Sequence, residues 1–402
     1  MTLPTLSPLV AGKTPEETTV VAAMSGGVDS SVVAAWLHKL GYNVIGITLQ
    51  LWDYTPAQSE SGGESGGESK KFGTCCALDD VYDARRVCQT AGFPHYVLNY
   101  ESEFKDKVID DFVDTYLAGA TPIPCVRCNQ RIKFDSLLEK AKKLGGDVLV
   151  TGHYVRKVMN EQGVAELRQG LSTDKDQSYY LFTTTPEQLA FSAFPLGDMT
   201  KDETRALAEE MGLHVKSKPD SQDICFVPGG DYRKVVRKFA PEAERKGHFV
   251  NSSGDILGTH NGIINFTVGQ RRGLGIAFGE PMYVIAIRPE SGEVVLGPKE
   301  ELGVKTFMVK DLNWLTTPPA PDEQITVRVR AGHQGVPGEV DVLDDVLDGG
   351  RVQVRLFDPE EAVSPGQAAV FYADKTLLGG GWIENPHSRK NGERVKVDIS
   401  AA

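Results

Sequence analysis

The feature that most constrains this chain is the segment at residues 25–31, Ser-Gly-Gly-Val-Asp-Ser-Ser, which directly follows an apolar run at residues 19–23. A strand that leads into Ser-Gly-Gly and then into a helix gathers unpaired backbone N–H groups around one hollow, which suits a phosphate or pyrophosphate. Apolar residues recur at helical spacing from Val33 to Leu40, which predicts that the positive end of a helix dipole faces this anion. The lysine of the Walker loop is missing. An ordinary capped strand–turn–helix is the alternative, and the motif in this context favours a nucleotide site.

The first half of the chain alternates predicted strands with predicted helices. Apolar, β-branched runs predict buried strands at residues 43–52, 95–98 and 147–151. Apolar residues at helical spacing predict helices around residues 84–91, 101–117 and 134–141. Thr200 and Glu203 form a capping box that predicts one further helix. Repeated strand–helix units indicate an α/β fold with a parallel, doubly wound sheet and a ligand site at the carboxyl ends of its strands.

The rest of the chain has a different pattern. Residues 54–73 are rich in glycine and poor in apolar residues, which predicts a flexible surface insertion. Beyond Lys218 closely spaced glycines indicate a small mixed or β-rich domain, and the short alternating apolar runs that follow indicate a compact β-barrel. A length of 402 residues suits two or three domains. We place them at residues 1–217, 218–287 and 288–402.

The expected cellular location and the charge distribution of the chain restrict the classes of function that it can have. The N-terminal residues lack the basic start and apolar core of a signal peptide, and no later run could span a bilayer, so we expect a cytoplasmic protein without a membrane partner. The net charge of −12 argues against indiscriminate binding of nucleic acid. However, residues 121–146 and residues 233–246 each hold six Lys/Arg against two Asp/Glu. Because counterion release depends on the contacts made, such local basic surfaces can bind RNA at a defined place.

The cysteines carry the second chemical signal. In the cytoplasm they are expected to be thiols, metal ligands or catalysts rather than a disulfide framework, and six are present: Cys75, Cys76, Cys88, Cys125, Cys128 and Cys225. Cys88 lies on an apolar helical face, which indicates a core residue.

Cys128 is the strongest candidate for a reactive thiol. We expect it at or just before a helix start, where the dipole and the basic residues Arg127, Arg131 and Lys133 favour the thiolate. Cys225 lies in a second polar segment, where the α/β pattern ends, so the two cysteines suit a site between domains. Two alternatives remain: ordinary thiols, or structural zinc at Cys125 and Cys128. Zinc needs four ligands, and the remaining pair, Cys75 and Cys76, is adjacent in sequence, which is an unfavourable geometry for chelating one ion.

Seven segments together resemble one family. The motif at residues 25–30 looks like the PP-loop of ATP pyrophosphatases, and the order and spacing of all seven are similar to those of tRNA-specific 2-thiouridylases. The matching segments are AMSGGVDSS at 23–31, CNQRIKF at 128–134, TGHY at 151–154, KDQSYYL at 175–181, SQDICF at 221–226, VGQRRGLGI at 268–276 and SPGQAAVFY at 364–372. The resemblance implies a PP-loop domain of the adenine nucleotide alpha hydrolase type, a central domain and a C-terminal β-barrel. It also implies that the substrate is the wobble uridine of tRNAs for Lys, Glu and Gln.

The resemblance also assigns residues to roles. ATP, with Mg²⁺ positioned by Asp29, is implied as cosubstrate, with contacts from Ala23, Met24, Ser25, Gly26, Gly27, Val28, Asp29, Ser30, Leu49 and Gly152. Contacts to tRNA are implied for Lys175, Asp176, Gln177, Arg328 and Val329. Cys225 would carry a persulfide received from a cysteine-desulfurase relay. Cys128 would be the partner thiol that frees the sulfur, which leaves a Cys128–Cys225 disulfide to be reduced.

The chemistry is consistent with these residues, because a urea-like oxygen leaves poorly until adenylation turns it into AMP. One departure is Cys125, where some members of the family have another residue. Cys125, Cys128 and Cys225 could therefore hold a [4Fe–4S] cluster with one iron open to sulfide.

Two other functions of the protein remain as alternatives. An amide-forming PP-loop ligase, such as a GMP or NAD synthetase, shares the loop but needs neither the two cysteines nor a barrel, and a non-catalytic RNA-binding protein needs no intact PP-loop.

Overall fold

The computed structural model describes residues 4, 6–52, 78–220, 223–276, 279–343 and 350–386. The predicted insertion at residues 54–73, together with Cys75 and Cys76, lies outside the described residues. Within the described ranges no helix has both the length and the apolar character that crossing a membrane requires.

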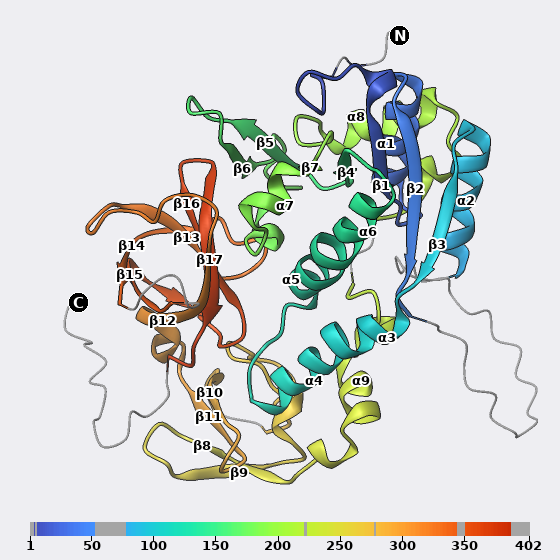
Figure 1. The fold of residues 1–402 in the computed structure, drawn as a ribbon. Coiled ribbons are helices and arrows are strands. Elements are labelled where there is room, and N and C mark those ends of the chain that lie inside the picture. Colours follow the sequence, from blue (N-terminus) through green and yellow to red (C-terminus); the bar gives the residue numbers. More distant parts are fainter. Residues whose placement is uncertain are drawn as a thin grey trace, which may run out of the picture.

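A five-stranded parallel sheet forms the first domain (Figure 1). Its strand order is β3-β2-β1-β4-β7, and every neighbouring pair is parallel. The strands are β1 (Thr19–Ala23), β2 (Asn43–Gln50), β3 (His95–Asn99), β4 (Val148–Val150) and β7 (Ser192–Ala193). The strand order reverses between β1 and β4, which in doubly wound sheets is where ligands bind. The predicted α/β class is therefore confirmed.

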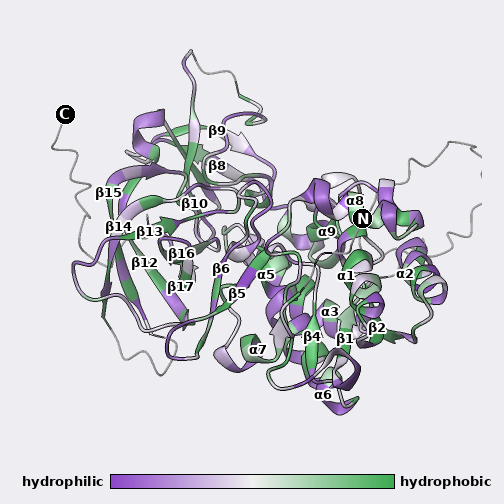
Figure 2. Cartoon of the chain, turned by 90° about the horizontal axis from the view of Figure 1, so that it is seen from above, coloured by the Kyte–Doolittle hydropathy of each residue, from purple (hydrophilic) through white to green (hydrophobic). Residues whose placement is uncertain are grey.

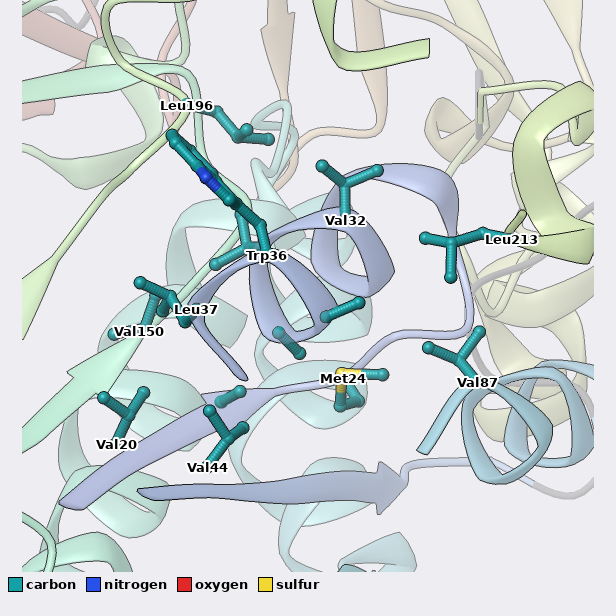
Figure 3. Packing of buried hydrophobic residues seen from close by; sticks show 14 of the residues in the cluster. Val20, Met24, Val32, Trp36, Leu37, Val44, Val87, Val150, Leu196 and Leu213 are labelled. Carbon is teal, nitrogen blue, oxygen red and sulfur yellow. The ribbon is translucent and has the colours of Figure 1, made fainter. Parts of the chain in front are cut away.

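Alternate residues of the strands face two different cores. Val20 and Val44 face a cluster that α1 (Val28–Lys39), α2 (Leu78–Ala91) and α8 (Lys201–Glu210) cover, and Trp36 of α1 is fully buried in it (Figure 3). Val21 and Leu149 face the opposite cluster. The predicted capping box is confirmed, since the Thr200 side chain accepts a hydrogen bond from the Glu203 N–H.

The two long helices predicted after β3 contain π-helical turns. The first consists of α3 (Glu101–Phe104), a π-helical turn (Lys105–Ile109) and α4 (Asp110–Leu117). The second consists of α5 (Pro124–Cys128), a π-helical segment (Asn129–Leu137) and α6 (Leu138–Lys143). Such turns often occur at functional sites.

Besides the two-residue strand β7, two further elements of the first domain were not predicted. One is the antiparallel hairpin of β5 (Val155–Met159) and β6 (Ala165–Gln169), which adds to the edge of the barrel through β17. The other is the short helix α7 (Pro186–Ala190). Single-turn 3₁₀ helices occupy Pro15–Glu17, Ser178–Leu181, His214–Ser217, Pro228–Gly230, Pro241–Ala243, Ile263–Asn265 and Lys299–Leu302.

The central part of the chain combines one helix with a four-stranded sheet. The helix is α9 (Tyr232–Phe239), and the strands, in the order β10-β11-β8-β9, are β8 (Gly247–Val250), β9 (Ile256–His260), β10 (Tyr283–Arg288) and β11 (Glu293–Gly297). The boundary that we predicted at residue 287 falls within β10, and the sheet continues to Gly297.

Six antiparallel strands close into a barrel at the C-terminal end of the described chain. In chain order they are β12 (Gly303–Trp314), β13 (Ile325–Arg328), β14 (Val336–Val342), β15 (Val352–Glu361), β16 (Ala368–Ala373) and β17 (Thr376–Ile383). The sheet order β12-β15-β14-β13-β16-β17 closes through pairing of β12 with β17. The predicted barrel is confirmed.

The barrel and the first domain share a hydrophobic core. In both views α5 lies between the barrel strands and the parallel sheet (Figures 1 and 2). Its Val126 is buried in the same cluster as Val370 and Trp382 of the barrel. The Thr121 N–H, just before α5, donates to the Pro365 carbonyl at 2.8 Å. The barrel therefore supports the segment that presents Cys125 and Cys128.

A buried ion pair also crosses this interface. Arg328 on β13 donates to Asp176 at 2.7 Å, and their side chains are only 12% and 1% exposed. The guanidinium also stacks on the Tyr372 ring at 4.7 Å. Asp176 further accepts hydrogen bonds from the N–H groups of Gly170 and Ser178.

We expect Asp176→Asn to destabilise the protein by about 3–5 kcal/mol, because it leaves Arg328 as an uncompensated buried charge. Urea denaturation followed by tryptophan fluorescence measures the change. The control is Glu139→Gln, which breaks the exposed Lys143–Glu139 pair on α6 and should leave the midpoint unchanged. Equal midpoints for both variants would contradict this account of the interface.

Candidate active site

The loop after β1 leaves the start of α1 open. Gly27 is the N-cap residue and no side chain caps the helix, so the first N–H groups of α1 remain available to a ligand. Gly26 has φ +73°, a conformation that favours glycine. The Met24 N–H donates to the Ile47 carbonyl at 2.7 Å, which ties the loop to β2. The arrangement is that of an anion-binding site.

Two serines close the loop on itself. The Ser25 N–H donates to the Ser30 hydroxyl at 3.0 Å, and the two hydroxyl groups share a hydrogen bond of 3.0 Å. Met24 points into the core beneath α1 and is buried (Figure 3). Of the residues predicted to contact ATP, Met24 can therefore offer only its backbone.

Gly152, which follows β4, packs directly against the start of α1. A Cβ built at this glycine would lie 2.8 Å from the Ser30 nitrogen and 2.9 Å from the Asp29 carbonyl carbon. The structure thus brings Gly152 together with the predicted loop, as expected at the carboxyl ends of β1 and β4. Leu49 lies near the carboxyl end of the neighbouring strand β2.

The Asp29 carboxylate is held by two side chains that the sequence did not identify. Lys201 at the start of α8 donates to its two oxygens at 2.7 and 2.9 Å. The Tyr154 hydroxyl donates to Oδ1 at 2.9 Å, and it also lies 3.0 Å from the Thr204 hydroxyl. Burial, reinforced by the Asp29 charge, raises the pKa of Tyr154, so this phenol stays protonated as a donor.

Lys201 also binds a second carboxylate, that of Asp220, at 2.7 Å. Asp220 in addition accepts from Lys175 at 3.1 Å and from Arg205 at 3.3 Å. Burial alone would raise the pKa of Asp220, but the hydrogen bonds from Lys201 and Lys175 outweigh it and the pKa is lowered. Asp220 is therefore ionised at neutral pH.

A second group of charges lies against the other side of the loop. Lys218 donates to the Gly26 carbonyl at 3.1 Å and forms ion pairs of 2.5 Å with Asp80 and Asp83 on α2. Burial would raise the pKa of Asp83, yet the contacts with Lys218 and His214 lower it. The glycine loop is thus fixed to α2 by an ionised cluster.

Cys128 and Cys225 border the same hydrophobic cluster. This aromatic cluster is built around Phe104, Phe112 and Phe226, and both half-buried cysteines pack against it. Phe226 meets Phe104 and Phe112 edge-on, with ring centroids 5.6 and 5.1 Å apart. The structure therefore places the two cysteines that sequence analysis paired on one hydrophobic cluster, although they come from different segments.

One expectation about Cys128 is wrong. The helix begins at Pro124 rather than at Cys128, so Cys125 lies in its first turn and Cys128 is the last residue of α5. Proline is favoured at the first helical position, and Pro124 therefore starts the helix instead of merely stiffening the approach. The neighbouring arginines bind a carboxylate: Arg127 and Arg131 contact Asp111 at 3.2 and 3.0 Å.

The three cysteines do not form a metal-binding group. Among the described residues, which include Cys125, Cys128 and Cys225, no three Cys, His, Asp or Glu side chains are placed to hold a metal ion. Cys125 is exposed and close to Tyr180, which packs on the cluster shared with the barrel rather than on the aromatic cluster. The geometry therefore does not fit a [4Fe–4S] cluster.

The residues predicted to contact tRNA occupy two kinds of position. Lys175 is partly exposed and pairs with Asp220. Asp176 and Arg328 form the buried pair described above, and Val329 is fully buried. The Gln177 side chain accepts a hydrogen bond from the Tyr154 N–H at 3.1 Å. This group therefore connects the barrel to the loop that carries Lys175.

Lys201, Asp220 and Tyr154 are the site residues that sequence analysis missed. Tyr154 belongs to the TGHY segment, and Asp220 immediately precedes the SQDICF segment, so both motifs already pointed near them. Lys201 offered only its place after the capping residue Thr200. The signal for all three was proximity to a motif, and their pairing depends on the tertiary structure.

Three family models match the chain in succession. The model described as the tRNA methyl transferase HUP domain matches residues 18–229, that of the tRNA methyl transferase PRC-barrel domain matches residues 233–298, and that of the Aminomethyltransferase beta-barrel domain matches residues 304–383.

Curated relatives are similar over nearly the whole chain. The "tRNA-specific 2-thiouridylase MnmA" of Rickettsia felis is 51% identical over 370 residues, covering 92% of this chain and 97% of the relative. The protein of the same name from Paracoccus denitrificans is 50% identical, covering 95% of each chain.

Solved structures are more distant. An NMN synthetase from Francisella tularensis has 14% identity and a TM-score of 0.33, covering 56% of this chain and 78% of its own. A 4-thiouridine synthetase in complex with RNA and ATP has 16% identity and a TM-score of 0.31, covering 56% of this chain and 51% of its own.

We expect Gly152→Ala to weaken binding of ATP by about tenfold or more, because the added methyl group would displace the start of α1. Equilibrium dialysis with labelled ATP measures the affinity. Gly279→Ala is the matched control, since a Cβ there meets open space and the glycine does not have a positive φ. Unchanged affinity in Gly152→Ala would exclude this loop as the nucleotide site.

Proposed function

The chain belongs to the family of tRNA-specific 2-thiouridylases, and from this premise we propose that it replaces the 2-oxygen of the wobble uridine of tRNA by sulfur. The observation that carries the proposal is that one segment connects both chemical centres. Its Lys218 contacts the glycine loop, its Asp220 is joined to Asp29 through Lys201, and its Cys225 packs on the aromatic cluster, as Cys128 does. A nucleotide-activated oxygen and a sulfur-bearing thiol would thus meet in one site.

ATP activates the substrate in the first step. The phosphates bind at the open N–H groups of α1, within the predicted set of residues 23–30, Leu49 and Gly152, and the uridine O2 attacks the α-phosphorus to release pyrophosphate. Mg²⁺ enters with the substrate ATP, and Asp29 is the carboxylate of the loop that would approach it. Adenylation makes the oxygen a good leaving group, which then departs as AMP.

Sulfur arrives in the second step. Cys225 carries a persulfide supplied by a cysteine-desulfurase relay, and the Cys128 thiolate attacks the Cys225 Sγ. The bond between Sγ and the outer sulfur breaks, hydrosulfide leaves with the electron pair, and a Cys128–Cys225 disulfide forms. Hydrosulfide attacks C2 of the adenylated uridine and expels AMP. A dithiol reductant then restores the two cysteines.

The predicted tRNA contacts divide between direct and supporting roles. Lys175 is the group that we propose to contact the tRNA of the Lys, Glu and Gln isoacceptors, whereas Asp176, Gln177, Arg328 and Val329 hold its loop and strand in place. On α9, Arg233, Lys234 and Lys238 are exposed and add positive charge. A tRNA substrate is consistent with the cytoplasmic location that we expect for this protein.

We expect Cys128→Ser and Cys225→Ser each to reduce formation of 2-thiouridine by about 10³-fold or more, because each removes a sulfur atom that takes part in the reaction. Purified protein, ATP, a persulfide donor and unmodified tRNA are incubated, and nucleosides are quantified by mass spectrometry. Release of pyrophosphate should persist at first turnover, since adenylation does not use the thiols, whereas release of AMP should be lost together with 2-thiouridine.

Cys125→Ser is the control for the cluster alternative. It should keep near-normal thiolation, because Cys125 is exposed and the proposed transfer of sulfur uses only Cys128 and Cys225. Anaerobic purification with iron and sulfide analysis accompanies it. Normal thiolation by the double variant lacking Cys128 and Cys225 would refute the mechanism, and loss of iron together with activity in Cys125→Ser would favour the cluster.

We expect the triple variant Arg233→Gln, Lys234→Gln, Lys238→Gln to bind tRNA more weakly and with a shallower salt dependence. Each lost phosphate contact should reduce the slope of log K against log salt by about 0.7–0.9. Filter binding at several salt concentrations measures it. Lys299→Gln, which removes an exposed cation of the 3₁₀ helix Lys299–Leu302, away from α9, should leave the slope unchanged. An unchanged slope in the triple variant would remove α9 from the tRNA surface.

A further inference from the structure

The segment that carries Cys225 is tied to the glycine loop at two points. Its described residues are 218–220 and 223–226, and we call it the Cys225 segment. At the first point Lys218 donates to the Gly26 carbonyl at 3.1 Å. At the second point Asp220 is joined to Asp29 through Lys201, whose ammonium group contacts both carboxylates at 2.7 Å.

The two ties differ in what an incoming nucleotide could change. Lys218 binds the Gly26 backbone carbonyl and two carboxylates on α2, and none of these three groups is a side chain of α1. Lys201 binds the side chain of Asp29, in the first turn of α1, where the phosphates would bind. A nucleotide therefore competes directly for Lys201 and leaves Lys218 engaged.

Lys201 is well placed to respond to such a change. Its side chain is only 12% exposed, so its charge is weakly screened by water. One ammonium group is shared between two carboxylates, and a triphosphate brings several more negative oxygens to the same place. Asp220 can lose Lys201 without becoming an unpaired charge, because Lys175 and Arg205 remain bound to it.

We propose that Lys201 is a positioning residue that couples the nucleotide site to the Cys225 segment: bound ATP draws Lys201 from Asp220 toward its phosphates and so makes Cys225 more accessible. The inference rests on the proposed function in one respect, namely that ATP is the ligand of the loop. Its consequence is that the sulfur-bearing thiol becomes reactive only after the oxygen can be activated, which prevents unproductive loss of sulfur.

The test measures alkylation of Cys225 without tRNA. Full-length protein is treated with iodoacetamide with and without MgATP, and the modified peptide is quantified by mass spectrometry against the exposed Cys125. In the wild type, MgATP should raise the Cys225 rate by at least about fivefold, which is the lower range of typical coupling between sites. An unchanged rate at saturating MgATP overturns the proposal.

Variants show whether Lys201 carries the effect. Lys201→Met and Asp220→Asn should each show, without nucleotide, the alkylation rate of the ATP-bound wild type, and MgATP should not raise it further. Lys201→Arg should restore part of the response. Arg205→Gln is the matched control, because it removes a cation that contacts Asp220 but not Asp29, and it should keep the response.

Binding of ATP is measured in parallel by equilibrium dialysis. If Lys201→Met binds ATP poorly, Asp220→Asn decides, since it retains both Lys201 and Asp29. A full response of Asp220→Asn to MgATP overturns the proposal. The two inferences fail separately: a wild type that forms 2-thiouridine without an alkylation response refutes the coupling alone, and one that shows the response without forming 2-thiouridine refutes the proposed function alone.

Discussion

The arrangement of the site depends on the uncapped N-terminus of α1. A helix start without a side-chain cap is costly unless a ligand or water satisfies its N–H groups, and here the surrounding chain preserves the open end. Gly26 takes a conformation that other residues avoid, and Gly152 lets β4 approach the backbone of Ser30. Behind the loop, Trp36 anchors α1 in a fully buried core. The anion site is therefore kept open by the rigidity of the packing around it.

Local patterns were sufficient to predict most of the elements. The parallel strands, the capped helix at Thr200 and the closed barrel follow from periodicity, capping chemistry and turn spacing, which act over a few residues. The hairpin of β5 and β6 escaped prediction because its strands are short and mixed in polarity, and because the pairing that joins it to the barrel comes from β17, which is distant in the sequence. The helix that begins at Pro124 was predicted to begin later, near Cys128. Pro124 was interpreted only as a residue that restricts the backbone before the helix, although its fixed φ also suits the first helical turn.

The candidate site could be predicted only where its residues lie inside a motif. The glycine loop and the two cysteines were found in this way. Lys201 and Asp220 were not, because a lysine after a capping residue and an aspartate in a loop are ordinary on any surface. Their significance comes from a contact of 2.7 Å between segments that are brought together by the fold. Burial distinguishes this ion pair from the many exposed ones, such as Lys143 with Glu139, which contribute little to stability.

Charge balance explains why such a network suits a nucleotide site. Asp29 and Asp220 face three cations, Lys201, Lys175 and Arg205, so the cluster holds one positive charge in excess. A cluster of this sign favours a polyanion, and because Lys175 and Arg205 also bind Asp220, this carboxylate would not be left unpaired without the shared lysine. The same cations lie at the start of the Cys225 segment, whose other end packs on the aromatic cluster that Cys128 also contacts. Electrostatics at the start of the Cys225 segment and apolar packing at its other end thus act together on the position of the Cys225 thiol.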